Sequence, residues 1–249
     1  MSIEVKGLHK WFGSQHVLRG VDLSIEAGVI TVIIGGSGQG KTVLLKHLIG
    51  LEKPSKGQIL VDGQDIVPLS EREMLPIRRK FGMVFQYAAL FDSMTVYENV
   101  CFPLREHTEV KESERRERVR AILEAVSLPD IEHKFPSELS GGMRKRVGLA
   151  RALVLNPKIV LYDEPTTGLD PVATENVDRM IQEAAQKFKV TSVVISHDIP
   201  STLRIADRIA MLFEGKIAAI GTAAEIRHHP HPMLRRFLEL GLSDRSVAA

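Results

Sequence analysis

Cysteine is nearly absent from this chain of 249 residues, and aromatic residues make up only 5% of it. The single cysteine, Cys101, excludes a disulfide within the chain and a Cys-x-x-Cys motif. With so few aromatic rings, the core must consist of valine, isoleucine, leucine and alanine. The 33 basic and 31 acidic residues leave a net charge of +2. This balance argues against a dedicated nucleic-acid binder, which usually carries a strongly basic face or arm.

Long hydrophobic runs are also missing. The most apolar stretch, residues 29–34, has the length of a strand, far short of the ~20 residues that a membrane-spanning helix needs. The start of the chain, MSIEVKGLHKWFG, lacks the basic segment and following apolar stretch of a signal peptide. We therefore expect a cytosolic chain without a membrane span of its own. Its 44% apolar and 26% charged residues are ordinary values for a folded domain.

Short apolar runs alternate with helical patterns in the first and last thirds of the chain. The apolar spacing over residues 177–188 predicts a helix. Strands are predicted where β-branched residues concentrate, at residues 3–5, 21–25, 29–34, 159–162 and 192–195. Together these patterns predict an α/β fold with a mainly parallel sheet covered by helices. The middle of the chain, about residues 87–156, is helical in pattern and is most simply an inserted subdomain.

A glycine-rich segment follows the predicted strand at residues 29–34 and precedes a predicted helix. It matches the pattern G-x-x-x-x-G-K-[ST] of a phosphate-binding loop, and we call it the phosphate loop: Gly35, Gly36, Ser37, Gly38, Gln39, Gly40, Lys41 and Thr42. Glycines let backbone N–H groups turn toward phosphate oxygens, and the positive end of the following helix points at the same place. Lys41 supplies a mobile positive charge, and the Thr42 hydroxyl is a ligand for Mg²⁺.

An acidic pair, Asp163 and Glu164, ends the buried strand predicted at residues 159–162. In a parallel sheet the active edge lies at such strand ends. We expect Asp163 to hold Mg²⁺ directly or through water, and Glu164 to polarise the attacking water as general base.

A second glycine-rich helix start lies upstream of the acidic pair, in the sequence LSGGM at residues 139–143, which we call the signature segment. Ser140 is a good N-cap residue, and apolar residues then recur at helical spacing. Gly141 and Gly142 make this helix start a second potential anion site. A chain with one phosphate loop does not need a second cradle unless that cradle serves the nucleotide of another chain.

In order and spacing, the phosphate loop, the signature segment and the acidic pair resemble those of ATP-binding-cassette (ABC) ATPases, from about Ile3 to Pro230. The resemblance implies a P-loop NTPase fold with an N-terminal antiparallel β part, and ATP sandwiched between two copies of the chain. It also implies roles for four further residues: Phe12, favoured over the alternative Trp11, stacks on adenine, Gln86 contacts Mg²⁺ and the attacking water, Asp170 couples the two halves, and His197 touches the γ-phosphate. Two positions depart from the common pattern, Gly36 in place of proline and Met143 in place of glutamine.

Residues 85–108 are apolar and aromatic for a surface segment, and exposed apolar patches usually mark interfaces. ABC ATPases receive their membrane partner here. The sequence of this segment, with ALF at residues 89–91 and PLREHT at residues 103–108, resembles the ATPases of Mla/MCE-type lipid transporters of Gram-negative bacteria. That resemblance implies a permease, an MCE-type lipid-binding protein, a small STAS-type subunit, and glycerophospholipid moved between inner and outer membranes from the cytoplasmic face of the inner membrane.

Two other interpretations remain open. The segment at residues 85–108 is also compatible with a permease for amino acids or another small molecule, and the whole chain with an ABC assembly ATPase that has no permease. In either case we expect residues 1–232 to form the ATPase domain and residues 233–249 a C-terminal tail.

Overall fold

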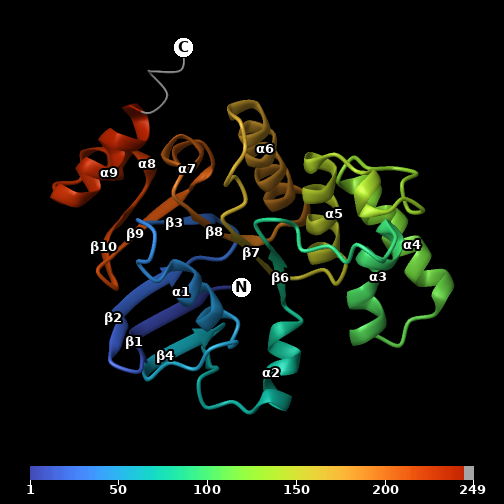
Figure 1. Cartoon of the computed structure of the whole chain (residues 1–249). Helices are drawn as coiled ribbons and strands as arrows, with labels where there is room; N and C mark the ends of the chain where they lie inside the picture. The colour runs from blue at the N-terminus through green and yellow to red at the C-terminus, as the bar shows by residue number, and fades with distance from the viewer. Residues whose placement is uncertain (244–249) are drawn as a thin grey trace.

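The computed structural model describes residues 1–243 of the chain and contains two sheets (Figure 1). The larger sheet has six strands in the order β10-β9-β3-β8-β7-β6, and the smaller one has four in the order β2-β1-β4-β5. The strands are β1 (Ile3–Phe12), β2 (Gln15–Ile25), β3 (Ile30–Ile34), β4 (Lys56–Val61), β5 (Gln64–Asp65), β6 (Phe81–Val84), β7 (Ile159–Asp163), β8 (Thr191–Ser196), β9 (Arg208–Phe213) and β10 (Lys216–Gly221). In the part of the chain that the structure describes, no helix is both long and apolar enough to cross a membrane.

The larger sheet is parallel except at one edge. Strands β3, β6, β7, β8 and β9 pair in parallel, and only β10 runs antiparallel to its neighbour β9. The predicted α/β fold with a mainly parallel sheet is therefore confirmed. Residues 208–221, which carry no prediction from the sequence, form β9 and β10. Because parallel strands end at the same edge, the segments that follow β3, β6, β7 and β8 meet there.

The smaller sheet is antiparallel and is formed by the N-terminal part of the chain. Its inward-facing side chains, such as Val5, Leu8 and Leu23, share a core with Leu44 and Leu45 on the helix that follows the phosphate loop. This core anchors the helix at Lys41–Leu48 between the two sheets. The smaller sheet therefore supports the helix that follows the phosphate loop.

The helices cover the larger sheet and form a lobe beside it (Figure 1). The lobe contains α3 and α4 in full, and α5 joins it to β6 and α6. The helices are α1 (Lys41–Leu48), α2 (Glu71–Arg78), α3 (Val96–His107), α4 (Glu112–Ala125), the 3-10 turn η1 (Pro136–Glu138), α5 (Gly141–Leu153), α6 (Pro171–Phe188), α7 (Ile199–Ile205), α8 (Ala223–His228) and α9 (Pro232–Ser243).

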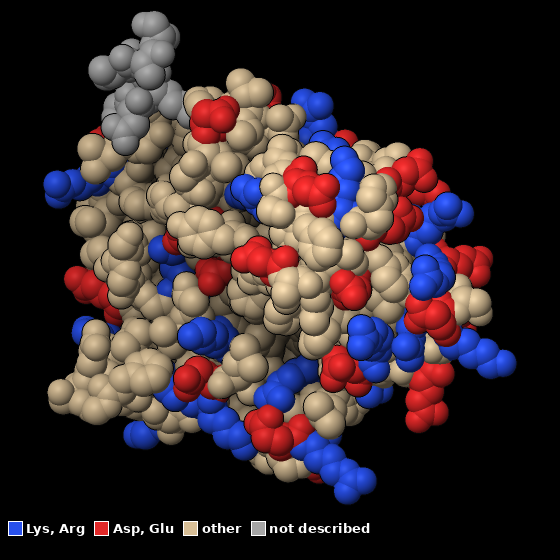
Figure 2. Space-filling model, turned by 45° about the vertical axis from the view of Figure 1, so that its right-hand side comes forward, with Lys and Arg blue, Asp and Glu red and all other residues tan. Residues whose placement is uncertain are grey.

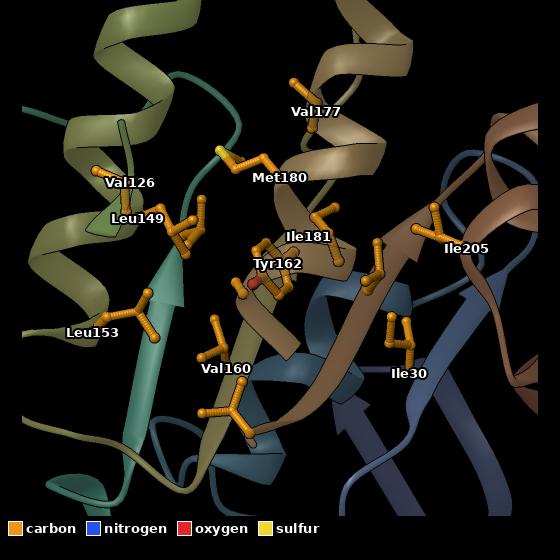
Figure 3. Packing of buried hydrophobic residues seen from close by; sticks show 14 of the residues in the cluster. Ile30, Val126, Leu149, Leu153, Val160, Tyr162, Val177, Met180, Ile181 and Ile205 are labelled. Atoms are coloured by element: carbon orange, nitrogen blue, oxygen red, sulfur yellow. The ribbon is translucent and has the colours of Figure 1, made fainter. Parts of the chain in front are cut away.

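One continuous core joins the lobe to the sheet. Figure 3 shows Tyr162 of β7 among side chains of α5 and α6, including Leu149 and Ile181, all of which are buried. The C-terminal helix α9 packs Leu234 and Leu238 into the same core. Residues 244–249, the end of the expected tail, lie outside the described residues.

The charged face of α4 is exposed to solvent. Arg116 lies 3.2 Å from Glu112 and Arg118 lies 2.5 Å from Glu114, both pairs one helical turn apart. Figure 2 shows acidic and basic side chains interspersed over the side of the molecule that carries the lobe. Exposed pairs of this kind contribute little to stability.

Helix α5 approaches β6 so closely that a glycine is required between them. A Cβ built on Gly82 would lie 2.5 Å from the backbone oxygen of Ala152. We therefore expect Gly82→Ala to destabilise the protein by about 1–3 kcal/mol, measured as a lower midpoint of thermal or urea unfolding. Gly141→Ala is the matched control, because a Cβ there meets no atom within 4 Å. Equal midpoints for the two variants would contradict the close approach.

Candidate functional site

The phosphate loop connects β3 to α1 and passes tightly against β9. A Cβ on Gly35 would lie 2.3 Å from the backbone oxygen of Leu212, so only glycine fits there. The Lys41 side chain folds back into the loop, and Nζ donates to the carbonyl oxygens of Gly35 at 2.9 Å and Gly36 at 3.1 Å. A buried cation thus lies where the sequence predicts phosphate to bind.

A side chain of the loop also ties it to the turn between β9 and β10. The Gln39 carbonyl Oε1 accepts a hydrogen bond from the backbone N–H of Glu214 at 2.6 Å. Gln39 is therefore committed to holding the loop, and its contribution to anion binding comes from the backbone. This tether links positions far apart in the sequence, and no sequence pattern indicates it.

Thr42 and Asp163 lie together, as expected for a shared Mg²⁺ site. The Thr42 hydroxyl donates to Asp163 Oδ1 at 3.3 Å. Burial raises the pKa of Asp163 above its ordinary value, and the hydrogen bond from Thr42 offsets part of that rise. Hydroxyl and carboxylate oxygens are the hard donors that Mg²⁺ prefers, so this pair fits the ion.

Glu164 receives three partners from separate segments. Thr167 Oγ1 donates to Oε2 at 2.9 Å, His197 Nδ1 lies 3.0 Å from the same oxygen, and Lys41 Nζ lies 3.6 Å from Oε1. Burial alone would raise the pKa of Glu164, but the hydrogen bond from Thr167 and the charges of His197 and Lys41 outweigh it and leave the pKa below its ordinary value. The carboxylate is therefore ionised at neutral pH, as a general base must be.

Strand register explains why these groups meet. Asp163 at the end of β7 pairs with Ile195 of β8, and the backbone N–H of Glu164 continues the ladder by donating to Ile195 O at 3.0 Å. His197 follows β8 by one residue and so reaches Glu164. Glu164 has a left-handed backbone (φ +49°), which turns the chain at the strand end, and such strained residues concentrate at functional sites.

Gln86 lies on the same edge of the sheet. Val84 of β6 pairs with Tyr162 of β7, which places Gln86 beside Glu164 along the sheet. Its side-chain Nε2 donates to the Tyr87 hydroxyl at 3.3 Å, and its amide forms no hydrogen bond to Asp163 or Glu164 in the structure.

The two candidate adenine-stacking rings differ in environment. Phe12 is 43% exposed at the end of β1, with the Lys10 ammonium 4.8 Å from the ring centroid. Trp11 is stacked on His16, with ring centroids 3.9 Å apart. Of the two, Phe12 presents the exposed ring.

The signature segment lines a cavity to which the phosphate loop does not contribute. Ser140 is the N-cap of α5, and its hydroxyl accepts a hydrogen bond from the Met143 N–H, as the sequence predicts. Asp170 caps α6 by accepting from two backbone N–H groups at 2.9 Å. Both capping residues, together with Gly141 and Gly142, line one cavity of about 590 Å³ that no phosphate-loop residue lines. Each chain thus presents two separate half-sites.

Two supporting residues carry no prediction from the sequence. Thr167 holds Glu164, and its position three residues after the carboxylate is the one sequence signal that could have suggested this. Lys145 of α5 donates from Nζ to the carbonyl oxygen of Pro165, which connects the signature helix to the segment after Glu164. No local pattern predicts that contact.

Comparison with known proteins gives consistent results. Residues 18–167 match the family described as ABC transporter. The chain is 47% identical over 238 residues to the probable ribonucleotide transport ATP-binding protein mkl of Mycobacterium leprae, covering 96% of this chain and 69% of that protein; for other mycobacterial mkl proteins the covered share is 66%. The intermembrane phospholipid transport system ATP-binding protein MlaF of Haemophilus influenzae is 41% identical over 245 residues, with 98% of this chain and 92% of that protein covered.

A solved structure shares the fold. The dimeric post-hydrolysis structure of the ATP-binding cassette MJ0796, bound to ADP and phosphate, superposes with a TM-score of 0.78 at 32% identity. The match covers 89% of this chain and 98% of that one.

The hydrogen bond from Thr167 can be removed with little change in shape. We expect Thr167→Val to raise the pKa of Glu164, because the hydrogen bond that most favours its ionised form is lost. Carboxyl NMR titration of the two proteins would measure the change. Thr167→Ser keeps the hydroxyl and is the control. An unchanged Glu164 pKa in the valine variant would contradict the assignment.

Proposed function

This chain belongs to the ABC transporter family, and from that membership we propose that it is the ATP-hydrolysing subunit of a bacterial transporter that moves phospholipid between inner and outer membranes. ATP hydrolysis follows from the family and from the site. The observation that carries the lipid assignment is the similarity to MlaF, which extends over 98% of this chain and 92% of that protein.

The residues of the site have distinct tasks in hydrolysis. Lys41 is already folded into the phosphate loop, so an entering phosphate meets a positioned cation. Glu164 accepts the proton of the attacking water. With His197 Nδ1 turned to Glu164, Nε2 is the ring nitrogen left for the γ-phosphate. Thr42, Asp163 and Gln86 would hold Mg²⁺, which neutralises phosphate charge when bound.

We also propose that the active unit is a dimer. The signature segment and Asp170 lie apart from the phosphate loop of their own chain, and the related MJ0796 cassette is dimeric. ATP between two copies would satisfy N–H groups of both chains at once. Loss of the γ-phosphate removes that bridge and favours opening, so the nucleotide biases a two-state element that can do work on a partner.

A permease would dock beside the glutamine loop, which we define as residues 85–91. A cavity of about 550 Å³ lies there, lined by Leu75, Phe85, Phe91, Phe102 and Pro103 among others. Phe85 and Phe91 are 41% and 43% exposed, and such apolar surface favours a protein interface. In this proposal the chain lies on the cytoplasmic face of the bacterial inner membrane, with an MCE-type protein and a STAS-type subunit as further partners.

The proposal retains the domain limits expected from the sequence. Residues 1–232 are the ATPase domain, residues 87–156 are its inserted helical subdomain, and residues 233–249 are the tail. A second candidate substrate comes from the mkl relative, whose name specifies ribonucleotide transport.

Replacing the general base should separate binding from turnover. We expect Glu164→Gln to bind ATP, to lose turnover by on the order of 10²–10⁴-fold, and to accumulate an ATP-bound dimer in size-exclusion chromatography. Glu175→Gln, an exposed acid on α6, should behave as wild type. Wild-type turnover in Glu164→Gln would remove this residue from the mechanism.

Purification from native membranes tests the partners and the substrate. In mild detergent we expect a polytopic membrane protein and an MCE-type protein to accompany the tagged chain, with bound glycerophospholipid identified by mass spectrometry. Phe91→Asp should release the permease while the isolated chain keeps its ATPase activity. Phe135→Asp is the matched control, since Phe135 is 42% exposed but lies outside that cavity.

Other outcomes of this purification would favour a different substrate or a different function. ATPase activity of the complex stimulated by ribonucleotides other than ATP, and not by phospholipid, would favour the mkl-like substrate. A chain that never retains a membrane protein would overturn the transporter assignment and favour an assembly ATPase.

A further inference from the structure

Two consecutive alanines in the glutamine loop adopt a backbone conformation that alanine disfavours. Ala88 has φ +61° and Ala89 has φ +48°, both in the left-handed region where a Cβ meets the following carbonyl. The loop closes through a hydrogen bond of 3.0 Å from the Ala88 N–H to Phe85 O, so Gln86 lies inside this turn. The neighbouring structure must hold the turn, since the local preference opposes it.

Arg151, near the end of α5, holds both strained residues. Its Nη1 donates to Ala89 O at 2.8 Å and its Nη2 to Ala88 O at 2.7 Å. The fixed fork of a guanidinium suits two successive carbonyl oxygens. Within residues 1–243 the Arg151 guanidinium forms no ion pair with a carboxylate. The two carbonyl groups are therefore its principal electrostatic partners.

Close packing of α5 makes this contact rigid. A Cβ on Gly148 would lie 3.1 Å from the Ala88 Cβ, and a Cβ on Gly82 would lie 2.5 Å from Ala152 O. Helix α5 is thus seated directly against β6 and against the turn. Ala88 cannot move toward the helix, and the guanidinium opposes movement of either alanine away from it.

The other end of the glutamine loop, at Phe91, is held by a residue other than Arg151. Asn99 of α3 is fully buried and exchanges hydrogen bonds with the backbone N–H and C=O of Phe91 at 2.8 and 3.1 Å. Its amide also donates to Met94 O at 3.0 Å. The conformation on the Gln86 side therefore depends on Arg151, and that on the α3 side depends on Asn99.

We propose that Arg151 is a positioning residue for Gln86: it keeps the strained turn at Ala88 and Ala89 closed, and so keeps the Gln86 amide at the edge of the nucleotide site. This inference rests on the proposed ATPase function. Ser140 caps the N-terminus of α5, so a single rigid element connects the signature segment at one end to the glutamine loop near the other. Movement of α5 would therefore be transmitted to Gln86 through the two hydrogen bonds that Arg151 donates to the turn.

Steady-state kinetics of the full chain tests the proposal. We expect Arg151→Gln to lower kcat by about 10- to 100-fold, the scale of a displaced catalytic group. It should also raise the Mg²⁺ concentration needed for half-maximal rate, because Gln86 is assigned to the ion. KM for ATP should stay unchanged, since the phosphate loop does not contact Arg151. Arg118→Gln, the same substitution on the exposed face of α4, is the control and should match wild type.

A second substitution distinguishes positioning from general structural support. Ala89 is exposed, and glycine adopts a positive φ without the cost that alanine bears. Ala89→Gly in the Arg151→Gln background should therefore recover part of kcat and of the Mg²⁺ dependence. If Arg151→Gln does not yield folded protein, Arg151→Lys takes its place: it keeps the charge, loses the fork, and should show the same changes to a smaller extent.

The outcomes separate this inference from the function on which it rests. Wild-type kcat and Mg²⁺ dependence in Arg151→Gln would overturn the positioning role. A loss of rate that only follows the loss of folded protein, with an unchanged Mg²⁺ requirement and no recovery on Ala89→Gly, would overturn it equally. Absence of ATPase activity in the wild-type chain would instead contradict the proposed function.

Discussion

The ionised carboxylate of Glu164 is the group on which the rest of this site depends. A partly buried carboxyl tends to take up a proton, because burial disfavours its charged form. Thr167, His197 and Lys41 oppose that tendency from three different segments. Their convergence requires β3, β8 and β7 to be neighbours in this order, since each segment follows or borders a different strand. The order of strands in the parallel sheet is thus a condition for the charge state of one side chain.

The chain carries a second set of anion-binding groups, which lies apart from its own phosphate loop. Ser140 and Asp170 cap two helices whose N-termini border one cavity. Helix N-termini offer unpaired N–H groups and a favourable dipole to an anion. Separation of the two half-sites makes a second copy of the chain the natural source of the missing groups. In the proposed dimer, nucleotide binding and association are one event, and hydrolysis therefore controls opening.

Left-handed backbone occurs at three residues where the chain leaves the sheet edge beside the site. Glu164, Ala88 and Ala89 all have left-handed conformations without being glycine, and each is held by long-range hydrogen bonds. Glycines remove side chains where segments pass closely, as at Gly35 against β9 and Gly82 against α5. The core around Tyr162 makes these tight approaches stable, because it joins the lobe and the sheet into one packed unit.

The sequence by itself determined the features that depend on neighbouring residues. The strand–glycine loop–helix order identified the phosphate loop, the end of a buried strand located Asp163 and Glu164, and the N-cap role of Ser140 followed from its spacing to the helix. Tertiary structure alone decided which groups meet across long separations in the sequence. These are the hydrogen bonds between Gln39 and the Glu214 backbone, between His197 and Glu164, and between Arg151 and the carbonyl groups of the two alanines. Local patterns record preferences over a few residues, whereas these contacts depend on strand order and on how closely α5 packs, and no short stretch of sequence contains that information.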